Sequence, residues 1–413
     1  MPSPSDTTPG LTRRTVLHSA ATVPFAASVV GVARAEPSGG PRIATLNLGL
    51  GVSLTPVLFA EDATQRRRVV GDLYESVHAS DVPRRMAVLA DELAATGAGV
   101  VALQEAASVA ADGIDSVDFL DELTQALDDT DADYRVAAVS ETTSVSLPGL
   151  VDGDETTVTL RDRDAILVRE GVESTEIPNV TLDARLAVPL GEGGETVEIS
   201  RGVAASGVSV PGGPTFAVGS THLERASSEI RTAQATELAA WADKRDGRVV
   251  VAGDVNATPD DEAYDTLAAS IEPVTGDVGP TCCRSSDLTS GDLSRTVDHV
   301  FVRGFDGTDP TRFVTGDDLR IETPEGERWP SDHAGVVVNL DAVPLETASP
   351  SATPTPIVTT QSPPEPTTSS TPTENPTSPP TDGTSTSADA AGFGILASLV
   401  ALVVAAVRAR KHD

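Results

Sequence analysis

The sequence predicts an α/β sandwich for residues 36–346 of this 413-residue chain. Segments that look like strands alternate with segments that have helical periodicity, as in sheets covered by helices. The run Val-Val-Val-Ala at 249–252 is apolar without alternation, which is typical of a strand that is covered on both faces. No low-complexity break and no internal repeat interrupts the stretch, so we expect one domain.

The expected elements follow from these patterns in chain order. We expect strands at 42–47, 99–104, 157–169, 215–223, 248–253, 297–303 and 335–340. We expect helices at 82–95, 117–127, 228–244 and 260–268. In the second of these helices Phe119, Leu120, Leu123 and Leu127 recur at helical spacing and form one apolar stripe. Such a stripe indicates a helix that packs against a sheet.

Residues 1–35 have the pattern of an export signal. Two arginines, Arg13 and Arg14, precede an apolar stretch at 20–32, and the sequence Ala33-Arg34-Ala35 follows. Paired arginines, a moderately apolar core and a small-x-small end resemble a twin-arginine signal peptide that is cleaved after Ala35. We therefore expect the domain to be exported in the folded state.

The C-terminal part has two further segments. Residues 347–388 are rich in Thr, Ser and Pro, and they predict a disordered stalk because they cannot bury enough apolar surface to fold. Residues 389–413 contain an uncharged apolar run at 390–407 and a basic end, which predicts a transmembrane segment whose end stays in the cytoplasm. This segment resembles the sorting signals that archaeosortases cleave, with Ala391 in place of the usual proline. We expect an extracellular domain that is tethered to the cell membrane.

The charge of the chain is strongly negative. There are 62 acidic residues against 29 basic ones, a formal net charge of -33, and the only lysines are Lys244 and Lys411. An acidic, lysine-poor composition resembles that of proteins from salt-loving archaea. In molar salt the Debye length falls to about 3 Å, so the net charge does not exclude a phosphate-bearing substrate. Nucleic-acid affinity, however, could not come from counterion release, which weakens as salt rises.

Polar residues stand where several of the expected strands end. These are Asn47, the pair Gln104-Glu105, His222, and Asp254 with Asn256. Any one of them has a simple explanation, because strand ends are hydrated and Asp and Asn suit turns. Together they predict a site, since carboxylates, amides and histidines at several strand ends gather on one rim of a sheet.

The order of these motifs resembles a known family. The motifs are Ala44-Thr45-Leu46-Asn47, Leu103-Gln104-Glu105, Ser220-Thr221-His222-Leu223, Gly253-Asp254-Val255-Asn256, Val297-Asp298-His299-Val300 and Ser331-Asp332-His333. In this order they resemble the endonuclease/exonuclease/phosphatase superfamily, with His222 favouring its deoxyribonuclease-like and sphingomyelinase-like branches. The resemblance implies a four-layer α/β/β/α sandwich with the site at one edge. It also implies a metal-dependent phosphoesterase.

The resemblance further implies roles for the acidic and amide residues. Glu105 is the expected principal ligand of Mg²⁺ or Mn²⁺, with Asn47 beside it and Asp332 contributing. A hard cation of this kind prefers oxygen ligands and keeps several waters, so one or two carboxylates suffice. Asp254 is expected to orient or deprotonate the attacking water, and Asn256 to hold that water or a phosphoryl oxygen.

The two histidines are each expected to have an acidic partner, because a carboxylate fixes the tautomer and stabilises the cationic form. The family pattern pairs His333 with Asp298, and this pair is expected to contact the phosphoryl group. The partner of His222 is expected on the strand 157–169, where Asp162 and Asp164 share one face. We favour Asp162, and we expect His222 to protonate or polarise the leaving oxygen.

Two features close to these motifs have simpler explanations. His299 follows Asp298 in a strand, so its side chain should point the other way and form part of a wall. Cys282 and Cys283 are neighbours, with Cα atoms expected about 3.8 Å apart across a trans bond, which is short for an unstrained disulfide. We expect a packed thiol pair, and the alternative is a strained vicinal disulfide.

The expected activity is the hydrolysis of phosphodiesters outside the cell by a monomeric enzyme. The substrate is either a nucleic acid or a phospholipid-like head group, and nothing in the sequence decides between them. The alternative is a tethered surface module that keeps the fold without turnover. A broken motif would favour that alternative, yet every polar residue of the motifs is present.

Overall fold

The computed structural model of the chain describes residues 40–190 and 196–345. The predicted export signal, stalk and C-terminal apolar segment lie outside these residues, so they stay predictions. Within the described part, no helix is both long and apolar enough to cross a membrane.

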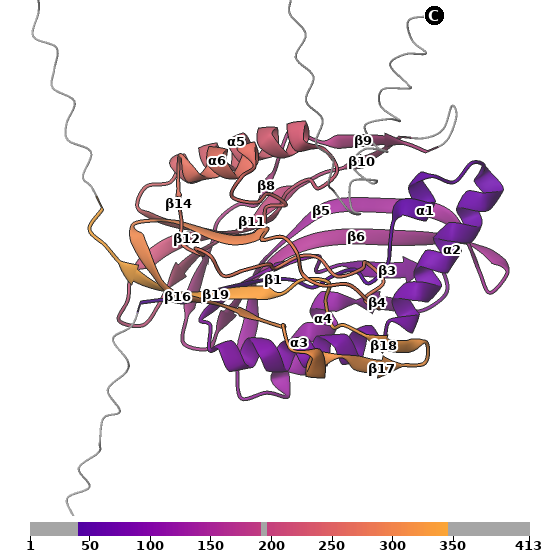
Figure 1. Cartoon of the computed structure of the whole chain (residues 1–413), viewed down its shortest axis with the longest axis horizontal. Coiled ribbons are helices and arrows are strands. Elements are labelled where there is room, and N and C mark those ends of the chain that lie inside the picture. Colours follow the sequence, from indigo (N-terminus) through magenta and orange to yellow (C-terminus); the bar gives the residue numbers. More distant parts are fainter. Residues whose placement is uncertain (1–39, 191–195, 346–413) are drawn as a thin grey trace, which may run out of the picture. The chain divides into compact units, whose positions relative to one another are not determined.

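Two β-sheets form the centre of the domain (Figure 1). The first sheet consists of β16 (Phe305–Phe313), β19 (Gly335–Ala342), β1 (Arg42–Asn47), β2 (Val100–Gln104), β6 (Asp154–Arg169), β3 (Ser108–Ala111) and β4 (Ser116–Asp118), with β5 (Tyr134–Val151) paired to β6. The second consists of β14 (Glu272–Pro273), β15 (Asp298–Arg303), β13 (Arg248–Asp254), β12 (Thr215–His222), β11 (Gly202–Ser209) and β7 (Glu173–Glu176), with β8 (Val180–Thr181) paired to β11. Two small hairpins join β9 (Leu186–Pro189) to β10 (Thr196–Ile199) and β17 (Ile321–Thr323) to β18 (Gly326–Arg328).

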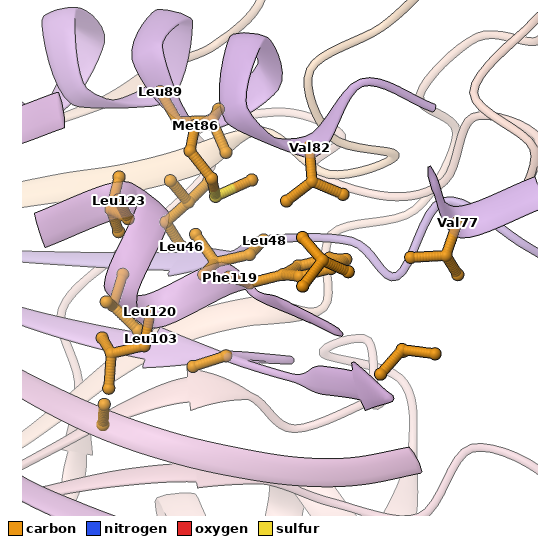
Figure 2. Packing of buried hydrophobic residues seen from close by; sticks show 14 of the residues in the cluster. Leu46, Leu48, Val77, Val82, Met86, Leu89, Leu103, Phe119, Leu120 and Leu123 are labelled. Atoms are coloured by element: carbon orange, nitrogen blue, oxygen red, sulfur yellow. The ribbon is translucent and has the colours of Figure 1, made fainter. Parts of the chain in front are cut away.

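Helices cover the outer faces of both sheets. The helical elements are α1 (Thr55–Leu58), α2 (Ala63–Ala79), α3 (Val82–Thr96), α4 (Phe119–Asp128), α5 (Ser228–Asp243), α6 (Glu262–Ala268) and the 3₁₀ turn η1 (Asp317–Leu319). One apolar cluster joins α2, α3 and α4 to the first sheet, and Figure 2 shows Met86 and Leu89 of α3 facing Phe119 and Leu123 of α4. A second cluster fills the space between the two sheets, and a third joins the second sheet to α5 and α6. The predicted four-layer α/β/β/α sandwich is therefore confirmed.

Every expected strand and helix is present, with ends shifted by a few residues. The structure adds the helix α2, which the sequence analysis did not predict. Asp62 caps this helix by accepting a hydrogen bond from the backbone N–H of Gln65 at 2.8 Å. Its buried side chains Val70, Tyr74 and Val77 recur at helical spacing. Three consecutive arginines at 66–68 make the first turns polar and hide this short apolar stripe.

Strand pairing brings the polar strand ends to one edge. Asn47 is aligned with Gln104 in the parallel pair β1–β2, and His222 with Asp254 in the parallel pair β12–β13. Asp254 is also aligned with Asp298 of the antiparallel strand β15. Because β1, β2, β12 and β13 are neighbours across the apolar interior, the two rims face each other.

A buried link holds the two rims together. The amide nitrogen of Gln104 donates to the hydroxyl of Ser220 at 3.0 Å, and that hydroxyl donates to the carbonyl of Leu103 at 2.9 Å. These bonds run from the end of β2 in the first sheet to β12 in the second. They fix the register between the sheets at the level of the site.

Arg85 connects α3 to the loops that carry the site. It is 0% exposed, and it donates from Nε to the carbonyl of Pro330 at 3.0 Å and from Nη2 to the carbonyl of Leu48 at 3.0 Å. Nη2 also contacts the carbonyl of Gly49. The guanidinium therefore joins the segment after β1 to the segment that precedes Asp332.

We expect Arg85→Met to lower the free energy of unfolding by roughly 3 kcal/mol or more, because each buried carbonyl that loses its donor costs about 1–3 kcal/mol. Denaturant unfolding in molar salt measures the change. The matched control is Arg84→Met, since Arg84 is exposed and donates to one carbonyl, that of Glu322. Equal stabilities of the two variants would contradict this account of Arg85.

Candidate active site

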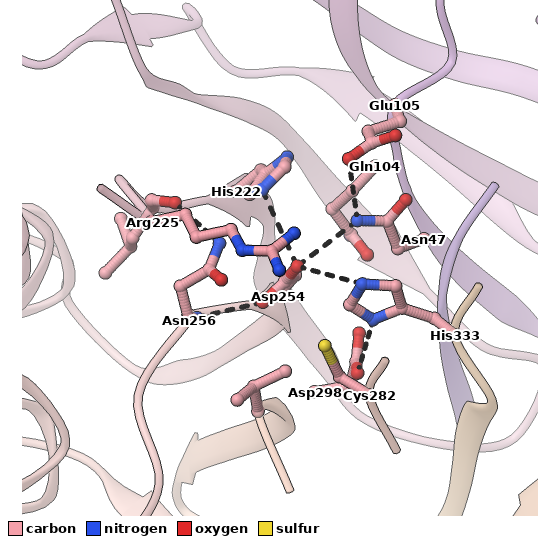
Figure 3. Close-up of polar contacts among 12 residues, drawn as sticks. Asn47, Gln104, Glu105, His222, Arg225, Asp254, Asn256, Cys282, Asp298 and His333 are labelled. Atoms are coloured by element: carbon pink, nitrogen blue, oxygen red, sulfur yellow. Dashed lines mark hydrogen bonds and ion pairs between the residues drawn. The ribbon is translucent and has the colours of Figure 1, made fainter. Parts of the chain in front are cut away.

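Asp254 lies at the centre of the polar edge and is 1% exposed. Its Oδ2 accepts a hydrogen bond from Nδ2 of Asn47 at 3.2 Å and lies 3.5 Å from Nε2 of His222 and 3.7 Å from Nε2 of His333 (Figure 3). Its Oδ1 accepts from the backbone N–H of Asn256 at 2.9 Å. Burial raises the pKa of Asp254, and the neighbouring charge of His333 opposes that rise. One carboxylate therefore faces both histidines at once.

His333 is held by the expected partner. Its Nδ1 lies 2.9 Å from Oδ2 of Asp298, and Asp298 is 0% exposed. Burial by itself lowers the pKa of His333, but the charges of Asp298 and Asp254 outweigh burial and raise the pKa to about 10. At neutral pH the imidazole is therefore a cation that is fixed by a carboxylate on each side.

His222 has the opposite protonation state. Burial, together with the charge of Arg201, lowers its pKa well below the ordinary value, so the imidazole is neutral at pH 7. Its Nδ1 is buried and has no hydrogen-bond partner among the described residues. Two histidines on one carboxylate thus have pKa values that are shifted apart, which is typical of groups with different tasks in a catalytic site.

The expected pairing of His222 with Asp162 is wrong in this structure. Oδ2 of Asp162 lies 3.2 Å from Nη1 of Arg201, and no ion pair joins Asp162 to His222. Arg201 also lies 3.8 Å from Glu224, so its guanidinium sits between two carboxylates. A guanidinium next to Asp162 keeps a permanent charge at every relevant pH, whereas His222 is neutral, and the stronger ionic partner takes the carboxylate.

Asp164 lies on the same face of β6 and is buried. Burial, with the nearby charge of Asp162, raises its pKa well above the ordinary value, while the nearby backbone N–H of His222 opposes that rise. The second acidic residue of the strand therefore lies near the backbone of His222, and the favoured residue, Asp162, pairs with Arg201.

The oxygen ligands expected for a metal ion lie on the first-sheet side of the edge. Oε2 of Glu105 accepts from the backbone N–H of Leu50 at 2.7 Å, and burial, followed by the charge of Asp332, raises the pKa of Glu105 to about 7. Oδ1 of Asp332 is buried without a hydrogen-bond partner among the described residues. Two neighbouring carboxylates, one with an orphaned oxygen, fit a hard divalent cation.

Asn47 is placed differently from the expectation. Its Nδ2 donates to Oε1 of Glu105 at 3.3 Å and to Asp254, while its Oδ1 accepts from the backbone N–H of Gly49 at 2.9 Å. The amide therefore acts as a donor between two carboxylates, and its oxygen is turned away from them. The structure supports a positioning role for Asn47 more directly than a ligand role.

Two site residues other than glycine have left-handed backbone conformations. Glu105 has φ of 51° and Asn256 has φ of 50°. Such conformations are uncommon outside glycine and cluster at functional sites, where the surrounding structure holds them in place. Nδ2 of Asn256 donates to the carbonyl of Leu223 at 3.0 Å, which fixes the amide beside the end of β12.

The predictions for His299 and for the pair Cys282-Cys283 have different outcomes. Nε2 of His299 lies 3.1 Å from the carbonyl of Ala257, and the ring packs edge-on against Tyr264, so the wall position is confirmed. A disulfide joins Cys282 to Cys283, so the structure has the alternative that the sequence left open and not the favoured thiol pair. Sγ of Cys283 lies 3.9 Å from Nε2 of His333, so the pair borders the site.

The absence of a side chain at Gly49 leaves room for the carboxylate of Asp332. The φ of Gly49 is +69°, and a Cβ atom there would lie 2.6 Å from Oδ1 of Asp332. We expect Gly49→Ala to displace that carboxylate and to weaken divalent-metal binding, which isothermal titration with Mn²⁺ measures. Gly113→Ala is the matched control, because Gly113 has a similar φ of +75° and open space around its Cβ position. Equal metal affinity in the two variants would contradict the placement of Asp332 at the metal site.

Sequence reasoning missed two arginines of this edge, Arg201 and Arg225. Arg201 directly precedes β11 and Arg225 follows His222 by three residues, so each stands at a strand terminus like the predicted residues. Their position at strand ends was the signal by which the sequence could have identified them as site residues. An arginine at a strand end is common on acidic surfaces, and the sequence alone does not show that Arg201 pairs with Asp162 and Glu224 while Arg225 pairs with no carboxylate.

A comparison with protein families matches residues 44–333 to the Endonuclease/Exonuclease/phosphatase family. The chain belongs to this family. The match covers well over half of the chain and begins and ends at the strand β1 and at His333. No curated protein matches the sequence.

Several solved structures are similar to this chain at low sequence identity. They include the mannosyl-6-phosphatase Bt3783 of Bacteroides thetaiotaomicron, at 17% identity and a TM-score of 0.48 over 73% of this chain and 100% of that chain. They also include TDP2 of D. rerio complexed with a single-strand DNA product, at 18% identity and a TM-score of 0.43 over 73% of this chain and 99% of that chain.

Proposed function

We propose that this protein is a metal-dependent hydrolase of phosphodiester bonds. The observation that carries the proposal is the position of Asp254, whose Oδ2 lies 3.5 Å from neutral His222 and 3.7 Å from cationic His333. Hydrolysis of a phosphoester needs a positioned water, compensation of charge on the phosphoryl oxygens and help for the leaving oxygen. The edge supplies one group for each requirement. Asp254 is a carboxylate base for the water, His333 is a cation for the phosphoryl oxygens, and His222 is a second imidazole for the leaving oxygen.

The residues of the chain divide this chemistry among them. Asp254 accepts a proton from the attacking water, and its raised pKa makes it a stronger base than a surface aspartate. His333, kept cationic by Asp298, donates a hydrogen bond to a phosphoryl oxygen. His222 polarises the leaving oxygen. Asn47 donates to the carboxylates of both Asp254 and Glu105 and so fixes their positions relative to each other.

Glu105 and Asp332 would hold the divalent ion, Mg²⁺ or Mn²⁺, with waters completing its coordination. When bound, the ion neutralises negative charge on the phosphoryl oxygens. Without such a charge, burial and then the neighbouring carboxylate of Asp332 raise the pKa of Glu105 to about 7.

We also propose that the domain acts outside the cell as a monomer, tethered to the membrane by residues 389–413. The paired arginines at the N-terminus and the apolar run with a basic end at the C-terminus support this location. The acidic composition supports work in molar salt. The substrate is a nucleic acid or a phospholipid-like head group, both of which carry a phosphodiester.

The experiment is a substrate screen of the purified full-length chain in molar salt with Mg²⁺ or Mn²⁺. Plasmid DNA, RNA and vesicles with choline or ethanolamine phosphodiester head groups are the substrates, and His222→Ala is the control. We expect metal-dependent product from one class and much less from the variant. Absence of product from every substrate with both metals would favour the binding module without turnover.

A further inference from the structure

Arg225 is the one cation of the catalytic edge whose side chain has no partner in the described part of the chain. Nearly every arginine there donates a side-chain hydrogen bond or forms an ion pair, and the exceptions are Arg68, Arg169 and Arg225. Arg68 lies on α2 and Arg169 at the end of β6, whereas Arg225 follows β12. Its side chain is exposed, so solvent and ligands can reach the guanidinium.

The backbone that carries Arg225 is held firmly. Nη1 of the buried Arg231 donates to the carbonyl of Arg225 at 3.1 Å and to the carbonyl of Glu224 at 3.0 Å. The backbone N–H of Glu224 donates to Gln234 at 2.8 Å, and Ser227 caps the helix α5 that follows. The backbone hydrogen bonds fix the position from which the Arg225 side chain extends. The N–H donors of its guanidinium remain available for a ligand.

The side chain of Arg225 extends toward the catalytic residues in Figure 3. Figure 3 draws it among His222, Asp254 and Asn256, directed across the site from the end of β12. Burial is the main cause of the lowered pKa of His222, and the positive charge of Arg225 adds a smaller contribution. The side chain nevertheless forms no ion pair with Asp254.

A cation at this place adds to His333 and the metal ion in attracting an anionic substrate. The edge carries the carboxylates of Glu105, Asp254, Asp298 and Asp332, which repel a phosphate, while Arg201 is neutralised by Asp162 and Glu224. A guanidinium presents parallel N–H donors that match two oxygens of a phosphoryl group. Such a direct contact persists in molar salt, where long-range attraction is screened within about 3 Å.

We propose that Arg225 binds the non-bridging oxygens of the substrate phosphoryl group. This inference rests on the proposed function, because it assigns the substrate contact of the same site. The shared chemistry is a phosphoryl group, which either a phosphodiester or a terminal phosphomonoester supplies. A monoester carries more negative charge, so loss of Arg225 should affect it more.

The test compares Arg225→Ala and Arg225→Lys with Arg68→Ala, a matched control in which another exposed, unpartnered arginine is removed. The full-length chain is assayed in molar salt with Mg²⁺ on bis(p-nitrophenyl) phosphate and p-nitrophenyl phosphate, and inorganic phosphate binding is measured separately by calorimetry. We expect Arg225→Ala to raise KM and the Kd for phosphate by about 10- to 100-fold, as for a lost charge-assisted contact. Arg225→Lys should recover part of the loss, and guanidinium ion should partly rescue Arg225→Ala.

The outcomes separate this inference from the proposed function. A wild-type chain that binds phosphate through Arg225 but turns over neither ester would support the inference and contradict the function. Kinetic constants and phosphate Kd of Arg225→Ala that equal those of Arg68→Ala would overturn the inference while turnover of the wild type stands. Absence of both turnover and phosphate binding in the wild type would overturn both.

Discussion

Replacement of Asp254 by asparagine is expected to lower kcat by about 10²- to 10⁴-fold, the range that a positioned acid or base contributes. The amide keeps the shape of the carboxylate, and its oxygen can still accept from Asn47 or from the backbone of Asn256. It cannot take a proton from water, and it removes the negative charge shared by the two histidines. Steady-state kinetics on the substrate found in the screen measure the loss.

Asp260→Asn provides the matched control for this variant, because Asp260 is an exposed aspartate in the loop that follows β13. Both variants lose one negative charge, so a general electrostatic effect would lower both rates equally. Asp260→Asn should keep the stability of the wild type to within about 0.5 kcal/mol, as is usual at the surface, and unfolding in denaturant checks that Asp254→Asn is folded under the assay conditions. Undiminished turnover in Asp254→Asn would remove Asp254 from the catalytic centre.

Replacement of His333 by alanine is expected to lower kcat by about 10²-fold or more, because a fixed donor to the developing charge is lost. His78→Ala is the control, since His78 is exposed on α2 and stacks on Tyr74 away from the site. A similar loss in both variants would show that the effect of His333 is not specific to the site.

Asp298→Asn tests the charge of His333 without removing the ring. The wild-type pKa of His333 is raised to about 10, so its cationic form persists through neutral pH and is lost only as the pH rises through that value. Without the carboxylate of Asp298, the pKa falls and the cation is lost at lower pH. We therefore expect the alkaline limb of the kcat profile to move to lower pH, with activity retained on the acidic side. An unchanged profile would contradict the cationic role.

The sequence predicted the sandwich and most of the site because both depend on local patterns. Apolar runs that end in a polar residue mark strands and their rim, and the order of Asn47, Glu105, His222, Asp254 and His333 identified the edge. The predicted pairing of His333 with Asp298 is confirmed. Asp298 lies at the end of a strand and His333 lies in a short loop, and the two side chains meet at the same edge of the sheets.

The features that the sequence did not predict correctly depend mostly on contacts between residues that are distant in the chain. The position of Arg201 decides the partner of Asp162, and the two are joined only when β11 packs beside β6. The amide of Asn47 faces two carboxylates whose spacing no strand pattern gives. The helix α2 was hidden because its apolar stripe is short and its first turns carry arginines.

The dependence of turnover on Mg²⁺ in the wild type and in Glu105→Gln tests the central claim most directly. After treatment with a chelator, the wild type should regain its rate along a saturating Mg²⁺ curve. Glu105→Gln should need at least about tenfold more Mg²⁺, since even outer partners of a metal site change its affinity by about 10- to 100-fold. Identical Mg²⁺ curves for both proteins, or a wild-type rate that survives the chelator, would contradict the account.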